Sequence, residues 1–77
     1  MTLVDLMNEK TRLIGLRNQA YSQTHFCIAV GDHEGIKKNA KRLNLISKKI
    51  LVVEDAIKDA IQASQKLQSL LWEKYLI

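Results

Sequence analysis

Apolar residues recur with a heptad period along the second half of the chain. With Ile36 taken as position a, nine of the twelve a and d positions from there onward are apolar. They are Ile36, Leu43, Ile46, Ile50, Val53, Ile57, Ala60, Leu67 and Leu71. A repeat sustained over almost six heptads is typical of a coiled-coil seam, with an ordinary amphipathic core helix as the alternative. The pattern predicts one long helix over about residues 33–76.

The remainder of the chain predicts a second helix and a tight turn. No proline occurs, and three glycines interrupt a sequence rich in strong helix formers. Thr2, with Asp5 three residues later, forms a weak capping-box pattern, so a first helix is expected over about residues 2–30. Gly31 can adopt the left-handed conformation that ends a helix, and Asp32 can cap the start of the next one. Gly31-Asp32 is therefore the predicted turn.

A simple register argument places the two helices against each other. If the chain reverses between Gly31 and Asp32, facing residues have numbers that sum to about 63. Four apolar pairs meet this condition: Leu6 with Ile57, Leu13 with Ile50, Ala20 with Leu43, and Cys27 with Ile36. Four layers in register from one turn predict an all-α antiparallel helical hairpin that forms a single domain over residues 1–77.

The same register leaves part of the second helix without a partner. It places Arg17 opposite Ile46 and Lys10 opposite Val53. These two apolar side chains are therefore expected to lack apolar partners inside the hairpin.

The second helix also extends beyond the end of the first by roughly sixteen residues, or ~24 Å. This C-terminal extension, residues 62–77, is rich in apolar residues, and exposed apolar surface of this kind marks an interface. We expect the helix to continue through it and dock on another chain, because no glycine or proline marks a break. The alternative is a break near Ala63-Ser64, with Ser64 capping a short third helix.

Chain size also favours association. A core this small supplies roughly 3–5 kcal/mol, and such chains usually add a disulfide, a metal or a partner. Cys27 is the only cysteine, which excludes an internal disulfide and a cysteine-ligated zinc. We expect a homodimer that forms a four-helix bundle. The predicted self-association residues are Ile46, Val53, Ile57, Leu67 and Leu71, and the predicted C-terminal interaction patch is Leu70, Trp72, Tyr75, Leu76 and Ile77.

Cysteine usage and hydropathy indicate the compartment. A single cysteine and a start without signal-peptide features are typical of a cytoplasmic protein. The longest apolar runs, Phe26 to Val30 and Ile50 to Val53, are far shorter than the ~20 residues of a membrane span. No membrane segment is expected.

Positive charge is concentrated toward the turn. Residues 10–49 carry nine Lys and Arg against two acids, a net charge of +7, whereas the rest of the chain carries −3. Six of these cations form a basic face on the second helix: Lys37, Lys38, Lys41, Arg42, Lys48 and Lys49. Such a face can keep the chain in solution, bind an acidic protein or bind nucleic-acid phosphates. No aromatic residue is interleaved to stack on bases, and all three interpretations stay open.

Signals for catalysis are poor. His25 and His33 lie on either side of the turn, where capping and solvation are favoured over a metal site. Cys27 lies in an apolar run and is expected to be a packed thiol rather than a nucleophile. No catalytic residue, cofactor, metal or small-molecule substrate is expected.

These patterns predict a non-enzymatic protein–protein interaction module of the adaptor, inhibitor or regulator type. It would self-associate through the heptad seam of its second helix and bind a further protein. The alternative is a small dimeric nucleic-acid-binding regulator that uses the basic face near the turn.

Overall fold

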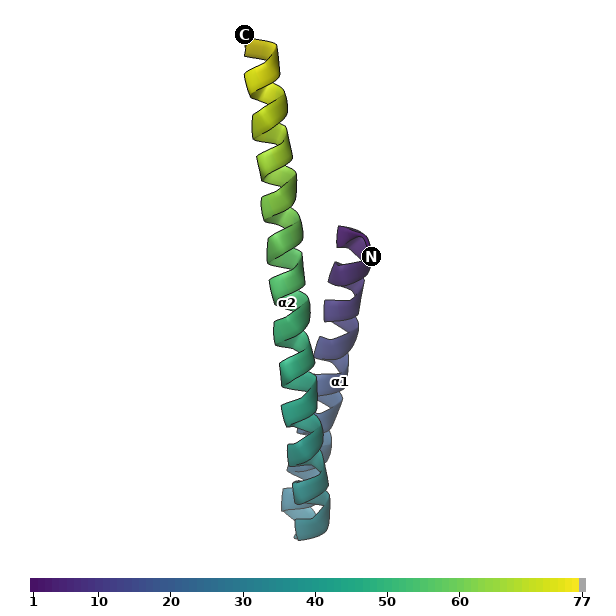
Figure 1. Ribbon diagram of the computed structural model, residues 1–77. Helices are drawn as coiled ribbons and strands as arrows, with labels where there is room; N and C mark the ends of the chain where they lie inside the picture. Colours follow the sequence, from purple (N-terminus) through teal and green to yellow (C-terminus); the bar gives the residue numbers. More distant parts are fainter. Residues whose placement is uncertain (77) are drawn as a thin grey trace.

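The chain folds into two antiparallel helices joined by a tight turn (Figure 1). The computed structural model describes residues 1–76, and their side chains as far as Lys74. Helix α1 spans Leu3–Val30, 28 residues, and helix α2 spans His33–Leu76, 44 residues. The predicted all-α helical hairpin is confirmed, with helix bounds close to those expected from the sequence.

Helix α1 begins at a capping box. The Asp5 amide donates a hydrogen bond to the Thr2 hydroxyl (3.2 Å), and the Thr2 amide donates to Asp5 Oδ2 (3.1 Å). Two N–H groups that a helix start leaves without partners are thereby satisfied. Hydrogen bonds with Thr2 favour the ionised carboxylate of Asp5, and the bond with the Thr2 backbone has a larger effect than the bond with its side chain. The pKa of Asp5 therefore lies below its usual value of 3.8.

The turn is built from Gly31 and Asp32, as predicted. Gly31 has φ 73° and ψ 24°, in the left-handed region where glycine meets no steric penalty. The Asp32 amide donates to the Cys27 carbonyl (2.8 Å), and the Gly31 amide donates to the carbonyl one residue further on (3.2 Å). Asp32 Oδ1 then accepts a hydrogen bond from the Gly35 amide (3.0 Å) and caps α2.

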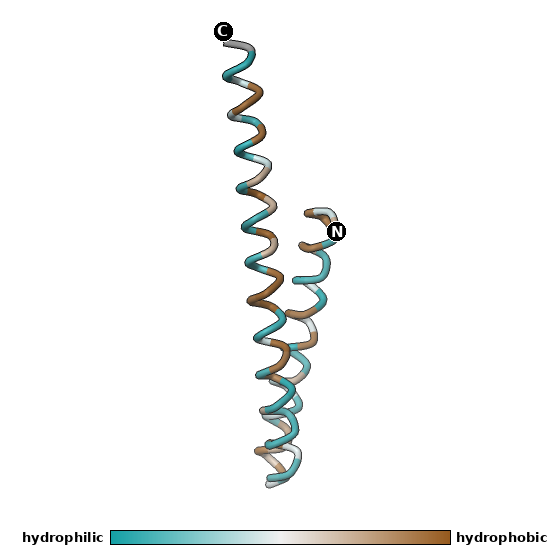
Figure 2. The backbone as a smooth tube through the Cα atoms, viewed as in Figure 1, coloured by the Kyte–Doolittle hydropathy of each residue, from teal (hydrophilic) through white to brown (hydrophobic). Residues whose placement is uncertain are grey.

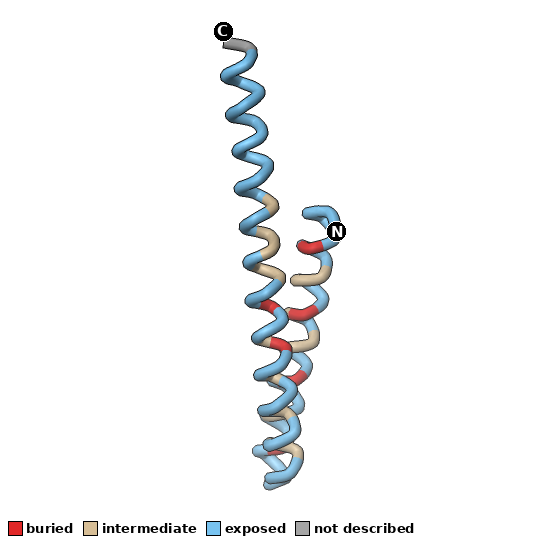
Figure 3. The backbone as a smooth tube through the Cα atoms, in the orientation of Figure 1, coloured by how far each residue is buried: buried red, intermediate tan, exposed pale blue. Residues whose placement is uncertain are grey.

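The core is a narrow seam between the two helices (Figure 3). Helix α1 contributes one buried residue per heptad: Leu6, Leu13, Ala20 and Cys27. Helix α2 contributes Ile46 and Ile50, which form a cluster with Leu13. In the four predicted layers every α1 member is buried; on α2, Ile50 is buried and Ile36, Leu43 and Ile57 are half-buried. The faces that the register argument paired are therefore the faces that meet.

The prediction that Ile46 and Val53 lack apolar partners inside the hairpin is wrong. Ile46 is 6% exposed and clusters with Leu13 and Ile50, and half-buried Val53 packs against the same cluster. Facing side chains in such a pair insert between levels, so a residue opposite Arg17 still reaches Leu13. Arg17 itself lies in the interface, since its Nε is buried.

The hairpin is a rod with principal extents of 69 × 17 × 14 Å. Its length comes from α2, which runs far beyond the N-terminus of α1 (Figure 1). Helix α2 passes through Ala63-Ser64 without interruption, so the predicted continuation is confirmed and the alternative of a short third helix is wrong. Over the described residues, neither helix is long and apolar enough to cross a membrane.

Candidate interaction surfaces

The C-terminal extension is uncovered along its described length. Half-buried residues recur along α2 as far as Ala60, whereas every residue from 61 to 74 is exposed. Leu67, Leu70 and Leu71 are 59%, 52% and 48% exposed. Together with Glu73 and Lys74 they line a shallow groove of about 440 Å³. Figure 2 shows that hydrophobic positions continue along α2 beyond the end of α1. The extension therefore presents an apolar side that no helix faces.

Of the other residues in the predicted C-terminal patch, the structure describes the side chain of Trp72 alone. Trp72 is 67% exposed, and it lies on a different side of α2 from Leu70, because residues two apart in a helix differ by about 200°. Tyr75, Leu76 and Ile77 lie outside the residues whose side chains the structure describes.

The predicted self-association residues also fall into two groups. Ile46 is buried in the core, and Val53 and Ile57 are half-buried in the seam that the hairpin itself forms. Leu67 and Leu71 are exposed beyond the end of α1. Contacts within the hairpin therefore cover Ile46, Val53 and Ile57, whereas Leu67 and Leu71 remain exposed. Association itself stays a prediction.

A second apolar line follows α2 at the edge of its contact with α1, where Val52 borders the groove between the helices and Ala56 is half-buried. We call it the outer stripe: Leu45, Val52, Ala56, Ala63 and Leu70. At about 100° per residue these positions fall within about 40° of arc. Leu45 and Val52 are 60% and 68% exposed although they lie in the part of α2 that packs on α1. The a and d positions of the heptad frame that begins at Ile36 do not contain this line, because its residues are spaced by seven, four, seven and seven.

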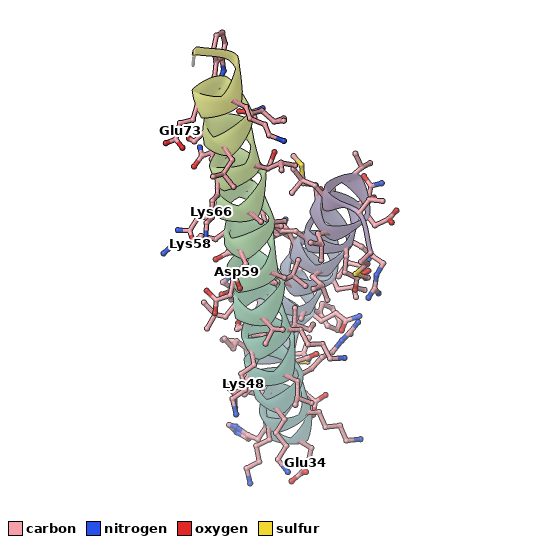
Figure 4. All side chains as sticks on the ribbon, turned by 45° about the horizontal axis from the view of Figure 1, so that its top comes forward. Glu34, Lys48, Lys58, Asp59, Lys66 and Glu73 are labelled. Atoms are coloured by element: carbon pink, nitrogen blue, oxygen red, sulfur yellow. The ribbon has the colours of Figure 1, made fainter. Side chains whose placement is uncertain are left out.

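Charged side chains flank the outer stripe. Figure 4 shows Lys48, Asp59 and Lys66 on the side of α2 that points away from α1. Lys49 lies on the opposite flank of the stripe from Asp59, and with Val52 it lines an open groove of about 450 Å³ between the helices. Both signs of charge therefore border one apolar line.

The basic face is exposed throughout. Its members are Lys37, Lys38, Lys41, Arg42, Lys48 and Lys49, and each is exposed. The ion pairs among the described residues join Lys10 to Glu54 (3.6 Å) and Arg12 to Glu9, and neither uses these six cations. The hydrogen bond from Arg12, with a smaller contribution from the charge of Lys49, lowers the pKa of Glu9.

The residues considered for chemistry, Cys27 and the two histidines, differ in exposure. Cys27 is buried, and its Sγ lies 3.7 Å from Asn39 Nδ2, which donates to it, and 4.0 Å from Asp32 Oδ2. His25 and His33 are exposed. Within the described part of the chain, no three His, Cys, Asp or Glu side chains form a group that could hold a metal ion.

No protein-family model, no curated protein and no solved structure matches this chain. Its class is set by its architecture, an all-α helical hairpin. The features that distinguish it are the exposed C-terminal extension, the outer stripe and the basic face near the turn.

Proposed function

We propose that this chain is a non-enzymatic protein–protein interaction module that self-associates through its long second helix. One observation carries the proposal: Leu67, Leu70 and Leu71 are each about half exposed on a helical extension that α1 does not reach. A contiguous exposed apolar surface in a small protein marks an interaction site.

The small core supports the same conclusion. Six hydrophobic residues of the described chain are buried, and they lie along one seam. Helical stability in proteins comes mainly from packing of an apolar face, and the extension has no such packing within one chain. A partner chain would supply it. The single cysteine suits a reducing compartment, and we place the module in the cytoplasm.

Molar mass measured by light scattering on a sizing column, over a range of protein concentrations, tests the proposal. We expect a dimer for the unmodified chain. Leu67→Lys should raise the dissociation constant more than about tenfold, because each copy would bury an unpaired charge. Ser69→Lys makes the same change in charge on the opposite side of the extension and should leave the mass unchanged. A monomer at every concentration would remove self-association from the proposal.

A second candidate function rests on the basic face. Its six exposed cations, none of them in an ion pair among the described residues, suit a dimeric regulator that binds nucleic-acid phosphates. Binding measured against salt concentration tests it. Replacing Lys37, Lys41 and Lys48 by alanine should flatten the slope of log K against log salt by about 0.9 per lost phosphate contact, whereas Lys58→Ala should not. Absence of binding at low salt would end this candidate.

A further inference from the structure

The outer stripe is complementary to a reversed copy of itself. Resting on the self-association proposed above, we propose that a second copy of this chain lies antiparallel to the first, with α2 against α2 along this stripe. In the proposed register, facing residue numbers sum to 108. Leu45 faces Ala63 of the second copy, and Val52 faces Ala56 of the second copy. Each large side chain meets a small one, so the helices approach closely, and two-fold symmetry repeats every pair.

Charge complementarity selects this register. Lys49 faces Asp59 of the second copy, and symmetry makes the pair occur twice. Both side chains are exposed in the hairpin and flank the stripe, so neither has to leave a core to form the pair. Shifting the register by one heptad loses these pairs and places either Val52 against Lys49 or Ala56 against Asp59. Both shifts oppose a charged side chain to an apolar one at the centre of the stripe, whereas the proposed register does so at its ends, where Leu70 faces Lys38 of the second copy.

The proposed register retains one like-charged pair, Arg42 with Lys66 of the second copy. Arg42 Nη1 donates a hydrogen bond to Gln23 Oε1 (3.3 Å), which draws its guanidinium toward α1. The long stem of Lys66 can carry its ammonium group to water at the edge of the interface. The repulsion is therefore smaller than the Lys49–Asp59 attraction at the centre of the stripe.

The length of α2 fits the same register. Helix α2 spans His33–Leu76, and the sum of 108 places Leu76 of one copy at the level of Asp32 in the turn of the other. The two α2 helices then overlap over their full length, about 66 Å, and the Leu70 side of each extension is covered. A contact between the extensions alone would span only about 24 Å. Because stable interfaces bury about 800 Å² per partner, the longer overlap is favoured.

The extension then lies beside the basic face of the second copy. Leu70 faces Lys38 of that copy, and Leu67 lies level with its Lys41 and Arg42. Aliphatic stems of lysine and arginine cover apolar surface while their charged ends stay in water. In this register, the apolar extension of each α2 therefore contacts the basic face of the other α2.

Reversal of the central charge pair tests the register in the full chain. Lys49→Asp and Asp59→Lys each create two like-charged pairs per dimer and should raise the dissociation constant by about 2-fold to about 30-fold. The double variant restores opposite charges and should return it to within about twofold of the unmodified value. Since Lys49→Asp also places an acid near Glu9, helicity of the monomer is followed by circular dichroism.

Each outcome decides between the two proposals. Recovery of affinity in the double variant supports the register. A dimeric unmodified chain with additive effects, or with none, overturns the register and leaves self-association standing. A chain that stays monomeric overturns both. If Leu67→Lys dissociates the dimer while the charge variants do nothing, the extensions pair with each other and the outer stripe is not the interface.

Discussion

Two glycines within the helices should respond in opposite ways to replacement by alanine. Gly15 lies in the exposed middle of α1, and a Cβ added there meets nothing within 4 Å. Gly35 lies in the first turn of α2, where a Cβ would stand 2.5 Å from Asp32 Oδ2 and 2.6 Å from Cys27 Sγ. Replacement by alanine therefore adds a methyl group in open space at position 15. At position 35 the methyl group meets the Asp32 carboxylate that caps α2 and the buried thiol of Cys27.

The magnitudes follow from those contacts. Gly15→Ala should stabilise the chain by about 0.4–1 kcal/mol, because alanine has less backbone entropy to lose on forming a helix. Gly35→Ala gains a similar amount but displaces the Asp32 carboxylate from its capping position, a loss of about 1 kcal/mol. It also crowds Cys27, and overpacking a buried side chain costs about 1–3 kcal/mol. The net expectation for Gly35→Ala is a destabilisation of about 1–3 kcal/mol.

Thermal unfolding followed by far-ultraviolet circular dichroism measures both changes. A difference of about 1 kcal/mol shifts Tm by about 4–8 °C in a domain of this size. All variants are compared at one protein concentration, because the Tm of any chain that self-associates depends on concentration. Gly15→Ala serves as the matched control for the effect of alanine on helix formation.

A second comparison isolates the contact with Cys27. Adding Cys27→Ala to Gly35→Ala removes the crowded sulfur, so the double variant should be more stable than the sum of the single effects predicts. An equal rise in Tm for Gly35→Ala and Gly15→Ala would mean that Gly35 does not lie close to Asp32 and Cys27.

Three further perturbations have expected outcomes. Leu13 is 2% exposed, so Leu13→Ala should cost about 2–5 kcal/mol in urea unfolding, and a loss below 1 kcal/mol would mean that the seam packs differently. Gly31 has φ 73°, so Gly31→Ala should lower stability by about 1–2 kcal/mol in the same assay, and an unchanged midpoint would contradict the left-handed turn. Because the pKa of Asp5 is lowered in the folded chain, its contribution is present above about pH 4 and is lost as the pH falls through the folded value. Asp5→Asn should therefore flatten the acid limb of Tm against pH, and an identical limb would show that the capping box carries no such linkage.

Local signals in the sequence were enough to define the helices. Thr2 and Asp5 act within one turn of each other, and Gly31 is suited to a left-handed position wherever it lies. The absence of proline made both helices continuous, including α2 through Ala63-Ser64. A single turn then sufficed to place the four predicted layers in register.

Tertiary packing alone decided which residues the hairpin covers. The register argument assigned one facing residue to each level and so left Ile46 opposite Arg17, whereas side chains that insert between levels bring Ile46 to Leu13. The need for glycine at position 35 arises from the approach of Cys27 across the turn. Such contacts depend on distances between chain segments, which periodicity along one helix does not contain. By itself, the sequence determined where the helices begin and end and which faces meet, while packing determined which apolar residues remain exposed.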